Sequence, residues 1–327
     1  MRGSMDVGKN EFVVALIATY RRFDELKRCL DCLVAQTRSL SAVVVVDNAA
    51  EDDIKALVES RGVRFCYLPL PGNQGCGAAL KTGEEYSFKE WGAQVSHFWV
   101  MDDDAAPTPA TLEQLLDADA QTAAAIVAPI CVTSEGKLFG LPDTVKLVPR
   151  KIRKTFRSPR EVRDYFGARL APIRWCVGVS FLVKSRAVRE SGLHRADFWM
   201  HGEDLEFSMR LCLSHGGVLD TLTIIPHLYP PGTHDGSMSA THFAKFCFHL
   251  QNMAYLVSHE IRNWFNWYCL GAAYRRFFVT FGWRWLTVRY ALITFWNGVV
   301  LAKTVGRLGG KKLRLMISRE VLRGKLQ

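Results

Sequence analysis

Several features that would assign the chain to a class at once are missing from its sequence. No charge-free stretch reaches the roughly 20 residues of a membrane-spanning helix. The first residues show no basic-then-apolar pattern, so we expect no export signal. Met1–Ser4 (MRGS) is typical of a vector leader, and we expect residues 1–10 to be a leader or a disordered segment. With 49% hydrophobic and 23% charged residues, the composition excludes a disordered chain.

Common metal and dinucleotide motifs are also absent. The nine cysteines are scattered, and Cys29 and Cys32 form a CxxC with no second CxxC to complete a zinc site. We therefore expect reduced thiols. The chain has neither a six-residue dinucleotide fingerprint nor a Walker lysine. Its 327 residues predict one large α/β domain with an additional lobe.

Acidic residues are nearly missing from the last fifth of the chain. Residues 261–327 hold 13 Lys and Arg against a single acid, whereas residues 1–260 hold 29 basic and 31 acidic residues. Trp and Phe crowd into the same region, and basic charge interleaved with aromatic side chains suits a nucleic-acid groove or an anionic membrane surface. Eight further basic residues, between Lys146 and Arg163, lie in a segment that we expect to be a mobile loop.

The chain does contain a series of short apolar runs separated by helical stretches. Phe12–Ala18, Ala42–Val46, Val63–Leu68 and His97–Met101 are expected to be buried strands, with a helix over about Phe23–Gln36. Continuous apolar runs are typical of a parallel sheet that is covered on both faces. Alternating strands and helices imply right-handed crossovers. The sequence therefore predicts an α/β fold with a Rossmann-like, doubly wound, mostly parallel sheet.

Polar or glycine-rich residues follow the end of each predicted strand. In doubly wound sheets, ligands bind at the carboxyl ends of the strands, so these positions are the candidate site. They are Thr19 and Tyr20, Asp47 and Asn48, Pro71–Gly77, and Asp102–Asp104.

The most informative of these positions is the triple aspartate, Asp102, Asp103 and Asp104. Alternate carboxylates at a strand end can face one divalent cation, since hard cations prefer oxygen ligands. The alternative is an acidic turn before a helix that begins near Ala110. Three neighbouring acids repel one another unless a cation or a basic partner neutralises them, and this favours metal and phosphate binding.

The remaining positions carry weaker signals. Asp47 can accept a hydrogen bond from a nucleobase or a ribose hydroxyl, and it can equally cap a helix. Residues 73–79 (NQGCGAA) form a glycine-spaced turn that enters a helix and lets backbone approach a ligand closely.

A second acidic group, Glu203 and Asp204, stands at the predicted start of a helix, after the glycine-interrupted strand Cys176–Val183. Carboxylates at a helix N-terminus are favoured by the helix dipole, which is a purely structural explanation. The functional explanation is a general base, which needs a carboxylate within hydrogen-bond reach of an acceptor hydroxyl.

Together these motifs resemble those of the family-2 inverting glycosyltransferases, which have the GT-A fold. The shared motifs are Thr19-Tyr20-Arg21-Arg22, Val46-Asp47-Asn48, Asn73-x-Gly75-x-Gly77, Asp102-Asp103-Asp104 and Gly202-Glu203-Asp204-x-Glu206-x-x-x-Arg210. The resemblance covers about residues 12–260, and Gly298–Gly310 is similar to the ending of bacterial rhamnosyl- and galactofuranosyl-transferases. Arg21, in place of a more frequent asparagine, and Gln251-Asn252, in place of Arg-Asn, depart from the pattern. The expected domains are a GT-A catalytic domain over residues 11–260 and a basic, aromatic-rich helical region over residues 261–327.

The resemblance implies a role for each matching residue. The nucleotide sugar is expected to contact Thr19, Tyr20, Arg22, Asp47, Asn73, Gly75 and Asp103. Asp102 and Asp104 would hold Mn²⁺ or Mg²⁺ with a histidine after the next strand, either His227, which fits best, or His234. Asp204 would be the catalytic base and Glu203 would orient the acceptor. Trp175 and Trp199 would stack on a sugar face, unless they belong to the core.

The implied function is transfer of a sugar from a nucleoside-diphosphate sugar to a hydroxyl of a lipid-linked or surface glycan, in polysaccharide or lipopolysaccharide biosynthesis. UDP-galactofuranose and dTDP-rhamnose are the leading donors, and the triple aspartate favours the UDP sugar. Two alternatives stay open. One is transfer to a polyprenyl phosphate, whose oxygen needs no deprotonation, and the other is a non-catalytic nucleic-acid-binding protein, against which the two acidic motifs argue.

The basic C-terminal region has two interpretations. Large apolar residues from Trp264 to Leu292 recur at helical spacing, but Arg275 and Arg289 interrupt them, so one helix or two are expected. We favour attachment to the anionic inner face of the cell membrane, where a lipid-linked acceptor would be found. The alternative is a helical lobe that packs on the catalytic domain with its arginines snorkelling. The expected location is cytoplasmic and peripheral to the membrane, and no nucleic-acid partner is expected.

Overall fold

The structure is a computed structural model that describes residues 11–141, 156–228, 240–259, 264–282 and 285–301. The chain divides into two compact units. We call the first the sheet unit (Met1–Asn73, Thr82–Leu193 and Leu211–Tyr229) and the second the helical unit (Gln74–Lys81, His194–Arg210 and Pro230–Gln327). The domain boundary that the sequence predicts at residue 260 stays a prediction.

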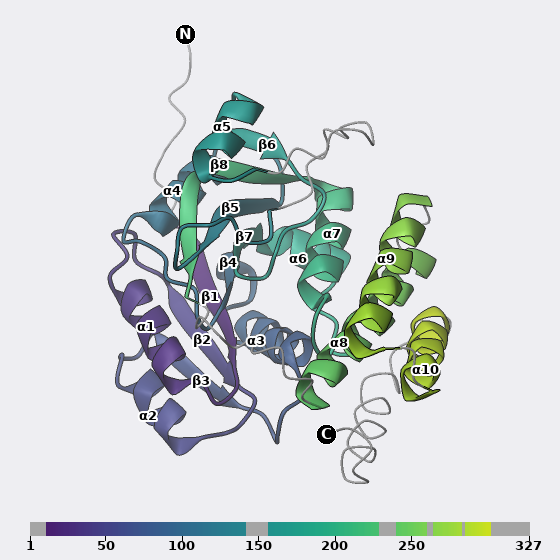
Figure 1. Ribbon diagram of the computed structural model, residues 1–327. Coiled ribbons are helices and arrows are strands. Elements are labelled where there is room, and N and C mark those ends of the chain that lie inside the picture. Colours follow the sequence, from purple (N-terminus) through teal and green to yellow (C-terminus); the bar gives the residue numbers. More distant parts are fainter. Residues whose placement is uncertain (1–10, 142–155, 229–239, 260–263, 283–284, 302–327) are drawn as a thin grey trace. The chain divides into compact units, whose positions relative to one another are not determined.

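The sheet unit contains a single sheet of eight strands in the order β3-β2-β1-β4-β7-β5-β8-β6 (Figure 1). Neighbouring strands are parallel from β3 to β4 and again between β5 and β8. β7 is antiparallel to both β4 and β5, and β6 is antiparallel to β8. The strands are β1 (Phe12–Thr19), β2 (Ala42–Asp47), β3 (Phe65–Pro69), β4 (Val95–Asp102), β5 (Ile126–Thr133), β6 (Leu170–Pro172), β7 (Ser180–Lys184) and β8 (Gly217–His227). Six strands share one direction, as the predicted mostly parallel sheet requires.

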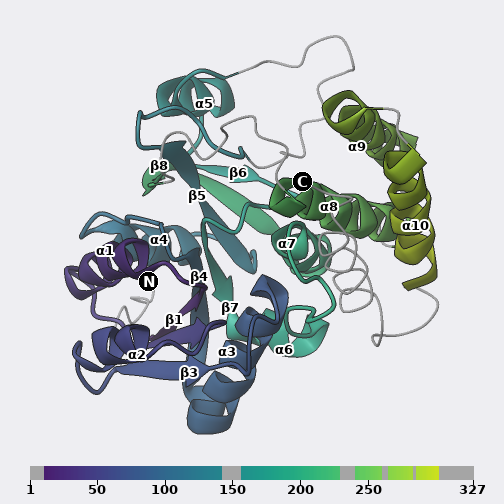
Figure 2. The ribbon, with the colours of Figure 1, turned by 60° about the horizontal axis from the view of Figure 1, so that its bottom comes forward.

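Helices cover both faces of this sheet (Figures 1 and 2). Leu26 of α1, Ile54 of α2 and Leu112 of α4 join one core with alternate residues of β1, β2 and β4. On the opposite face, Gly83 of α3 lies close to the side chains of Leu16 and Val46. This arrangement confirms the doubly wound fold. The helices are α1 (Phe23–Val34), α2 (Asp52–Glu59), α3 (Cys76–Trp91), α4 (Thr111–Asp119), α5 (Pro159–Phe166), α6 (Ser185–Ser191) and α7 (Glu203–His215), with a 3-10 turn η1 (Gly92–Gln94).

The strand ends meet at one edge of the sheet, as predicted. Thr19 of β1 pairs with Asp47 of β2, and Ala18 pairs with Asp102 at the end of β4. β8 ends at the same edge, because it runs parallel to β5 and pairs His227 with Thr133. The first four predicted strands agree with β1–β4 to within two residues at each end.

Two local predictions are wrong. The strand expected over Cys176–Val183 begins only at Ser180, because its partner β4 ends at Asp102, opposite the turn at Val179. The mobile loop expected up to Arg163 is also wrong in part, since α5 begins at Pro159. The Ser158 side chain accepts a hydrogen bond from the Glu161 N–H and caps this helix. Residues 142–155 of that segment lie outside the described residues.

The helical unit contains α8 (Ala240–His259), α9 (Trp264–Phe281) and α10 (Trp285–Leu301). α9 ends at Phe281, and the following Gly282 has a positive φ of 74° and donates its N–H to the Phe278 carbonyl. The apolar segment from Trp264 to Leu292 is therefore two helices. α10 lies directly against α8 at Gly298, where a Cβ would overlap the Gln251 backbone oxygen. Among the described helices, none has both the length and the apolarity that crossing a bilayer requires.

Candidate active site

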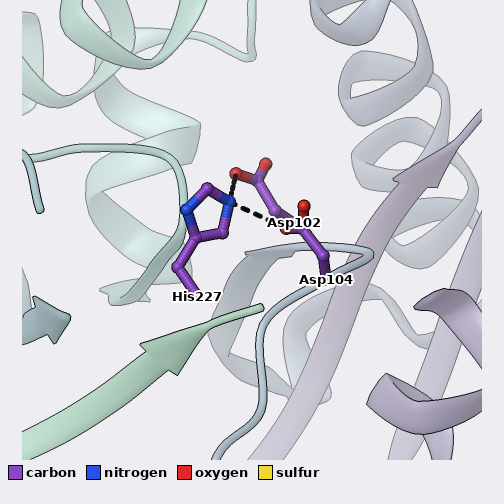
Figure 3. Close-up of side chains that lie close together, drawn as sticks. All are labelled: Asp102, Asp104 and His227. Carbon is purple, nitrogen blue, oxygen red and sulfur yellow. Dashed lines mark ion pairs between the residues drawn. The ribbon is translucent and has the colours of Figure 1, made fainter. Parts of the chain in front are cut away.

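Two carboxylates and an imidazole meet at the carboxyl edge of the sheet (Figure 3). Asp102 is the last residue of β4, and His227 is the last residue of β8. The turn after β4 pairs with the end of β8, because His227 forms a bridge with Ala105 and the Leu228 N–H donates to the Asp104 carbonyl at 2.9 Å. Backbone pairing thus brings together side chains that are more than a hundred residues apart in the chain.

This group has the chemistry of a divalent-cation site. The His227 Nε2 atom lies 2.9 Å from Asp104 Oδ1 and 4.0 Å from Asp102 Oδ2. One ligand atom from each residue falls within 4.8 Å of the other two. Two carboxylates and one imidazole suit Mn²⁺ or Mg²⁺, which take hard oxygen ligands and, for Mn²⁺, a nitrogen. The His227 ring also packs on Phe139, with 4.5 Å between ring centroids.

Asp103 lies between Asp102 and Asp104 in the sequence, but its carboxylate does not belong to the candidate metal site. The Thr19 hydroxyl donates to Asp103 Oδ2 at 2.8 Å, and Arg22 Nη1 lies 2.9 Å from Asp103 Oδ1. The second guanidinium nitrogen of Arg22 lies 2.6 Å from Asp104. Arg22 therefore bridges two of the three aspartates, and it supplies the basic partner that three neighbouring acids need.

The protonation behaviour of these aspartates differs because their neighbours differ. Burial raises the pKa of Asp103 to about 7, although Arg22 and Thr19 act in the opposite direction. Burial also raises the pKa of Asp104, but His227 and Arg22 outweigh it, so that the net pKa of Asp104 is lowered. The net pKa of His227 is raised. Burial lowers its pKa, and the carboxylates of Asp104 and Asp102 reverse this and raise it.

The other residues expected near the nucleotide have varied surroundings in the sheet unit. Tyr20 has 40% of its surface exposed. Asp47 is buried, and its carboxylate accepts from the backbone N–H groups of Ala49 and Glu51 and from the Tyr67 hydroxyl. These contacts hold the loop between β2 and α2, and the N-cap of α2 is Glu51 and not Asp47. Asn73, expected at the nucleotide, and Trp175, expected at the acceptor, are both half-buried. Their roles stay predictions.

The second acidic group opens helix α7 in the helical unit. Glu203 and Asp204 are its first two residues, and Asp204 Oδ1 accepts the Leu205 N–H at 2.8 Å. The Cys76 thiol donates to the Glu203 carboxylate. The other carboxylate oxygen, Glu203 Oε2, is buried and has no hydrogen-bond partner among the described residues. Burial and the neighbouring Asp204 raise the pKa of Glu203 to about 8, so this carboxyl is mostly protonated at neutral pH.

The glycine-spaced turn before α3 is packed against the segment that leads to this acidic group. Gly75 has a φ of 92°, and a Cβ there would overlap the Trp199 carbonyl oxygen and lie 2.5 Å from Cδ1 of its ring. A Cβ at Gly77 would overlap the carbonyl oxygens of Arg195 and Phe198. These glycines therefore permit close approach of residues 195–199, in addition to any approach of a ligand. The Trp199 ring packs on Phe248, with 4.7 Å between centroids.

Sequence reasoning missed two residues that contact the acidic segment. Cys76 was expected only as part of the glycine-spaced turn, and Asn252 only as part of a motif that departs from the family pattern. The Asn252 amide donates to the carbonyls of Met200 and His201, at 3.1 and 2.7 Å. No sequence signal could have found the Cys76 contact, because a thiol next to glycines has no fixed partner.

The predicted site residues thus form two groups. In the sheet unit the structure brings together Thr19, Arg22, Asp102, Asp103, Asp104 and His227. In the helical unit, Gly75 and Trp199 lie together, and the Cys76 thiol beside that glycine contacts Glu203, which precedes Asp204. His234, the alternative metal ligand, lies outside the described residues.

Comparisons with known proteins agree with the motifs. The model of the family "Glycosyl transferase family 2" matches residues 14–178. The chain is 26% identical over 282 residues to the galactofuranosyltransferase GlfT1 of Mycolicibacterium smegmatis, a match that covers 80% of this chain and 90% of the relative. It is 28% identical over 234 residues to the galactofuranosyltransferase GlfT1 of Mycobacterium tuberculosis H37Rv, covering 69% of this chain and 72% of the relative.

A solved structure shares the fold. The mannosyltransferase PcManGT from Pyrobaculum calidifontis, in complex with GDP-Man and Mn²⁺, superposes with a TM-score of 0.51 at 16% sequence identity. The match covers 95% of this chain and 80% of that one. This likeness confirms the predicted GT-A fold. The family match and the named relatives confirm the prediction of an enzyme. The chain belongs to glycosyl transferase family 2 and is a glycosyltransferase.

Proposed function

We propose that the protein transfers galactofuranose from UDP-galactofuranose to a hydroxyl of a lipid-linked or surface glycan, with inversion at the anomeric carbon. Relatives that match most of this chain are galactofuranosyltransferases, which supports this sugar over rhamnose from dTDP-rhamnose. The group formed by Asp102, Asp104 and His227 at the carboxyl edge of the sheet is the observation that carries the proposal.

The metal centre would bind the diphosphate of the donor. Asp102, Asp104 and His227 would hold Mn²⁺ or Mg²⁺, and a bound ion stabilises the negative charge that develops on the departing nucleoside diphosphate. Arg22 keeps the neighbouring carboxylates in place through its two ion pairs. Thr19 orients Asp103 through its hydroxyl, so that the triple aspartate keeps one arrangement.

Asp204 would act as the general base on the acceptor. Its carboxylate removes the proton of the attacking hydroxyl as the oxygen reaches the anomeric carbon, and a single displacement inverts the configuration. Glu203, whose pKa is raised to about 8, would be protonated at neutral pH and could donate a hydrogen bond to an acceptor oxygen. Trp199 and Trp175 would offer flat apolar surfaces to sugar rings.

A thermal-shift panel tests the donor and the metal together. UDP-galactofuranose, UDP-galactopyranose, dTDP-rhamnose and GDP-mannose are each added with and without Mn²⁺ or Mg²⁺. A ligand that binds only the native state raises the melting temperature. We expect the largest rise with UDP-galactofuranose and an ion present together. An equal rise in melting temperature with and without the ion would refute metal-dependent donor binding. A larger rise with dTDP-rhamnose would show that dTDP-rhamnose, and not UDP-galactofuranose, is the donor.

The membrane is the partner that we propose for the C-terminal helices. Trp285, Val288, Leu292, Phe295 and Trp296 recur at helical spacing on α10 and are all exposed, Trp285 to 72% and Leu292 to 66%. The opposite face of α10, with Tyr290, Ala291 and Thr294, is buried. We call the exposed set the α10 stripe. A contiguous apolar face of this kind marks an interaction surface.

Charge and shape favour an anionic bilayer as the occupant of this surface. Residues 261–327 carry 13 basic residues and one acid, which complements an anionic leaflet. Arg289 lies 5.4 Å from the centre of the Trp285 ring, so a cation accompanies the stripe. An apolar groove between α9 and α10, lined by Leu270, Phe278, Leu292 and Phe295 among others, continues the surface. This would attach the enzyme peripherally at the inner face of the cell membrane, close to a lipid-linked acceptor.

Sedimentation with vesicles tests the attachment. We expect the full chain to bind phosphatidylglycerol-containing vesicles, and the triple variant Trp285→Ser, Leu292→Ser, Trp296→Ser to stay in the supernatant. Leu213→Ser on α7, which also removes an exposed leucine, serves as the matched control. Retained vesicle binding by the triple variant would refute the assignment of the stripe. Light scattering then shows whether the stripe instead joins two copies of the chain.

A further inference from the structure

Three consecutive carbonyl groups lead into the candidate base, and other elements of the helical unit hold all three. The Trp199 carbonyl accepts the Cys76 N–H at the start of α3, at 2.9 Å. The Met200 and His201 carbonyls both accept from the Asn252 side chain on α8. Residues 199–201 therefore have little freedom to move relative to α3 and α8. Glu203 and Asp204 follow directly.

The backbone of this loop is also strained. His201 has a φ of 59° and Gly202 a φ of 97°, so two successive residues lie on the left-handed side. A residue with a side chain costs roughly 1–2 kcal/mol in that conformation. Such a conformation persists only where surrounding contacts hold it. The two hydrogen bonds from Asn252 act on the carbonyl groups that immediately precede Gly202, which is the place where a holding contact is needed.

Only an amide fits the position of Asn252. The side chain is 2% exposed, and both acceptors are carbonyl oxygens, so the residue must supply two donors and no negative charge. An aspartate of the same shape would place a carboxylate against two carbonyl oxygens. A hydrophobic residue would leave both buried carbonyls without their donor.

We propose that Asn252 is a positioning residue of the transfer reaction. By holding the carbonyls of Met200 and His201, it fixes the strained turn before α7 and thereby the direction of the Glu203 and Asp204 carboxylates. This inference rests on the proposed role of Asp204 as the base. It concerns the placement of that base and not the binding of the donor.

The neighbouring residue on α8 provides a matched control. Gln251 is fully buried like Asn252, but neither its amide nitrogen nor its amide oxygen has a hydrogen-bond partner among the described residues. Gln251→Met removes the amide and keeps the length of the side chain. We expect this variant to fold and to react like the wild type, because no described hydrogen bond is lost.

Hydrogen exchange measures the positioning without reference to catalysis. In Asn252→Ala we expect faster amide exchange over residues 200–206 than in the wild type, and no such change in Gln251→Met. Asn252→Asp keeps the shape of the side chain and serves as the second variant. Unchanged exchange over residues 200–206 in both Asn252 variants would overturn the holding role.

Kinetics then measure the consequence for the reaction. The assay follows nucleoside diphosphate release, with water as acceptor, from the nucleotide sugar that most raises the melting temperature of the wild type. Because a misplacement of about 1 Å can cost up to 100-fold, we expect kcat to fall roughly 10- to 100-fold in Asn252→Ala, with the KM for the donor unchanged. In Asn252→Asp, kcat relative to the wild type should rise as the pH falls, because the protonated acid can donate one hydrogen bond again.

The two proposals fail separately in this design. If Asp204→Asn loses activity while both Asn252 variants keep the wild-type kcat, the positioning role is wrong and the base stands. If Asp204→Asn keeps its activity, the proposed base is wrong, while hydrogen exchange still decides whether Asn252 holds the loop. A raised donor KM with an unchanged kcat in Asn252→Ala would likewise overturn the positioning role.

Discussion

The two acidic groups of this glycosyltransferase differ in how their surroundings shift the pKa values of their carboxyl groups. At the sheet edge, Arg22 and His227 contact the aspartates directly, and the pKa of Asp104 is lowered. At the start of α7, Glu203 is buried next to Asp204 and its pKa is raised to about 8. In the first group, cationic side chains lower the pKa of Asp104, whereas in the second group burial and a neighbouring carboxylate keep Glu203 mostly protonated at neutral pH.

The difference matches two kinds of chemistry. A carboxylate that stays ionised is a good ligand for a divalent cation, because no proton competes for its oxygens. A carboxyl group that is protonated at neutral pH can donate a hydrogen bond, which an ionised carboxylate cannot do. Under the proposed function, the same residue types would serve donor binding at the sheet edge and acceptor chemistry at the start of α7, because their neighbours differ.

The sharpest test of the second group is Asp204→Asn. Removing a general base from a hydroxyl acceptor is expected to lower kcat by about 10²–10⁴-fold, while the thermal shift caused by donor and metal is kept. Nucleoside diphosphate release measures the rate. The exposed Asp117→Asn on α4 is the control for an acid-to-amide change. A nearly harmless Asp204→Asn in an assay with polyprenyl phosphate would instead favour the phosphate as acceptor.

The first group is tested by Asp104→Asn with Mn²⁺ alone as ligand. We expect the metal-induced rise in melting temperature, which corresponds to about 2.7 kcal/mol at a hundredfold excess over Kd, to be lost. Asp103→Asn is the matched control within the same triple aspartate, since Asp103 contacts Thr19 and Arg22 and is not part of the metal group. Equal loss in both variants would show that the three aspartates act as one undivided acidic cluster.

Gly75 packs closely against Trp199, in the segment that leads to Glu203 and Asp204. We expect Gly75→Ala to disrupt this packing. The added Cβ would overlap the Trp199 carbonyl, and the φ of 92° adds backbone strain. Overpacking costs about 1–3 kcal/mol in unfolding free energy, in addition to that strain. Gly72→Ala is the control, because Gly72 has a similar φ of 83° and open space around a Cβ. Denaturant unfolding of both variants isolates the contribution of the contact, and equal losses would show that it has none.

The smallest expected effect is on the pH dependence of stability in Glu203→Gln. The folded-state pKa of Glu203 is about 8 against an ordinary value of 4.5, so the charged form is disfavoured by folding. Wild-type stability should therefore fall as the pH rises from about 4.5 to about 8, and glutamine should not show this loss. We expect nearly equal melting temperatures at pH 4.5 and a higher value for Glu203→Gln at pH 8. Glu206→Gln, which loses an ion pair to Arg210, should instead be less stable than the wild type at both pH values.

The sequence predicted the first four strands and the edge where their ends meet, because apolar runs and the polar residues after them are local signals. It could not predict how the aspartates are neutralised. Arg22 is in a recognised motif, but its two ion pairs depend on the turn after β4. The choice of His227 as the candidate ligand depended on the end of β8, and the structure brings it to the aspartates through backbone pairing with Ala105.

Two further features could not be predicted from the sequence, because they depend on contacts between distant parts of the chain. The strand expected from Cys176 is shortened by the length of its partner, which lies in another part of the chain. The apolar spacing from Trp264 to Leu292 is continuous in the sequence, but it passes from α9 to α10 across Gly282. Among the side chains at this spacing that the structure describes, Trp285, Val288 and Leu292 of α10 are exposed, whereas Phe281 of α9 is buried.

The contact at Gly298 links the two proposals made for the helical unit. At Gly298, α10 lies against the backbone of α8, and the nearest atom of α8 is the carbonyl oxygen of Gln251, the residue before Asn252. If α10 rests on a lipid surface, it would therefore press directly on α8, the helix whose Asn252 holds the loop before α7. Membrane attachment would then affect the position of the candidate base through the contact between α10 and α8.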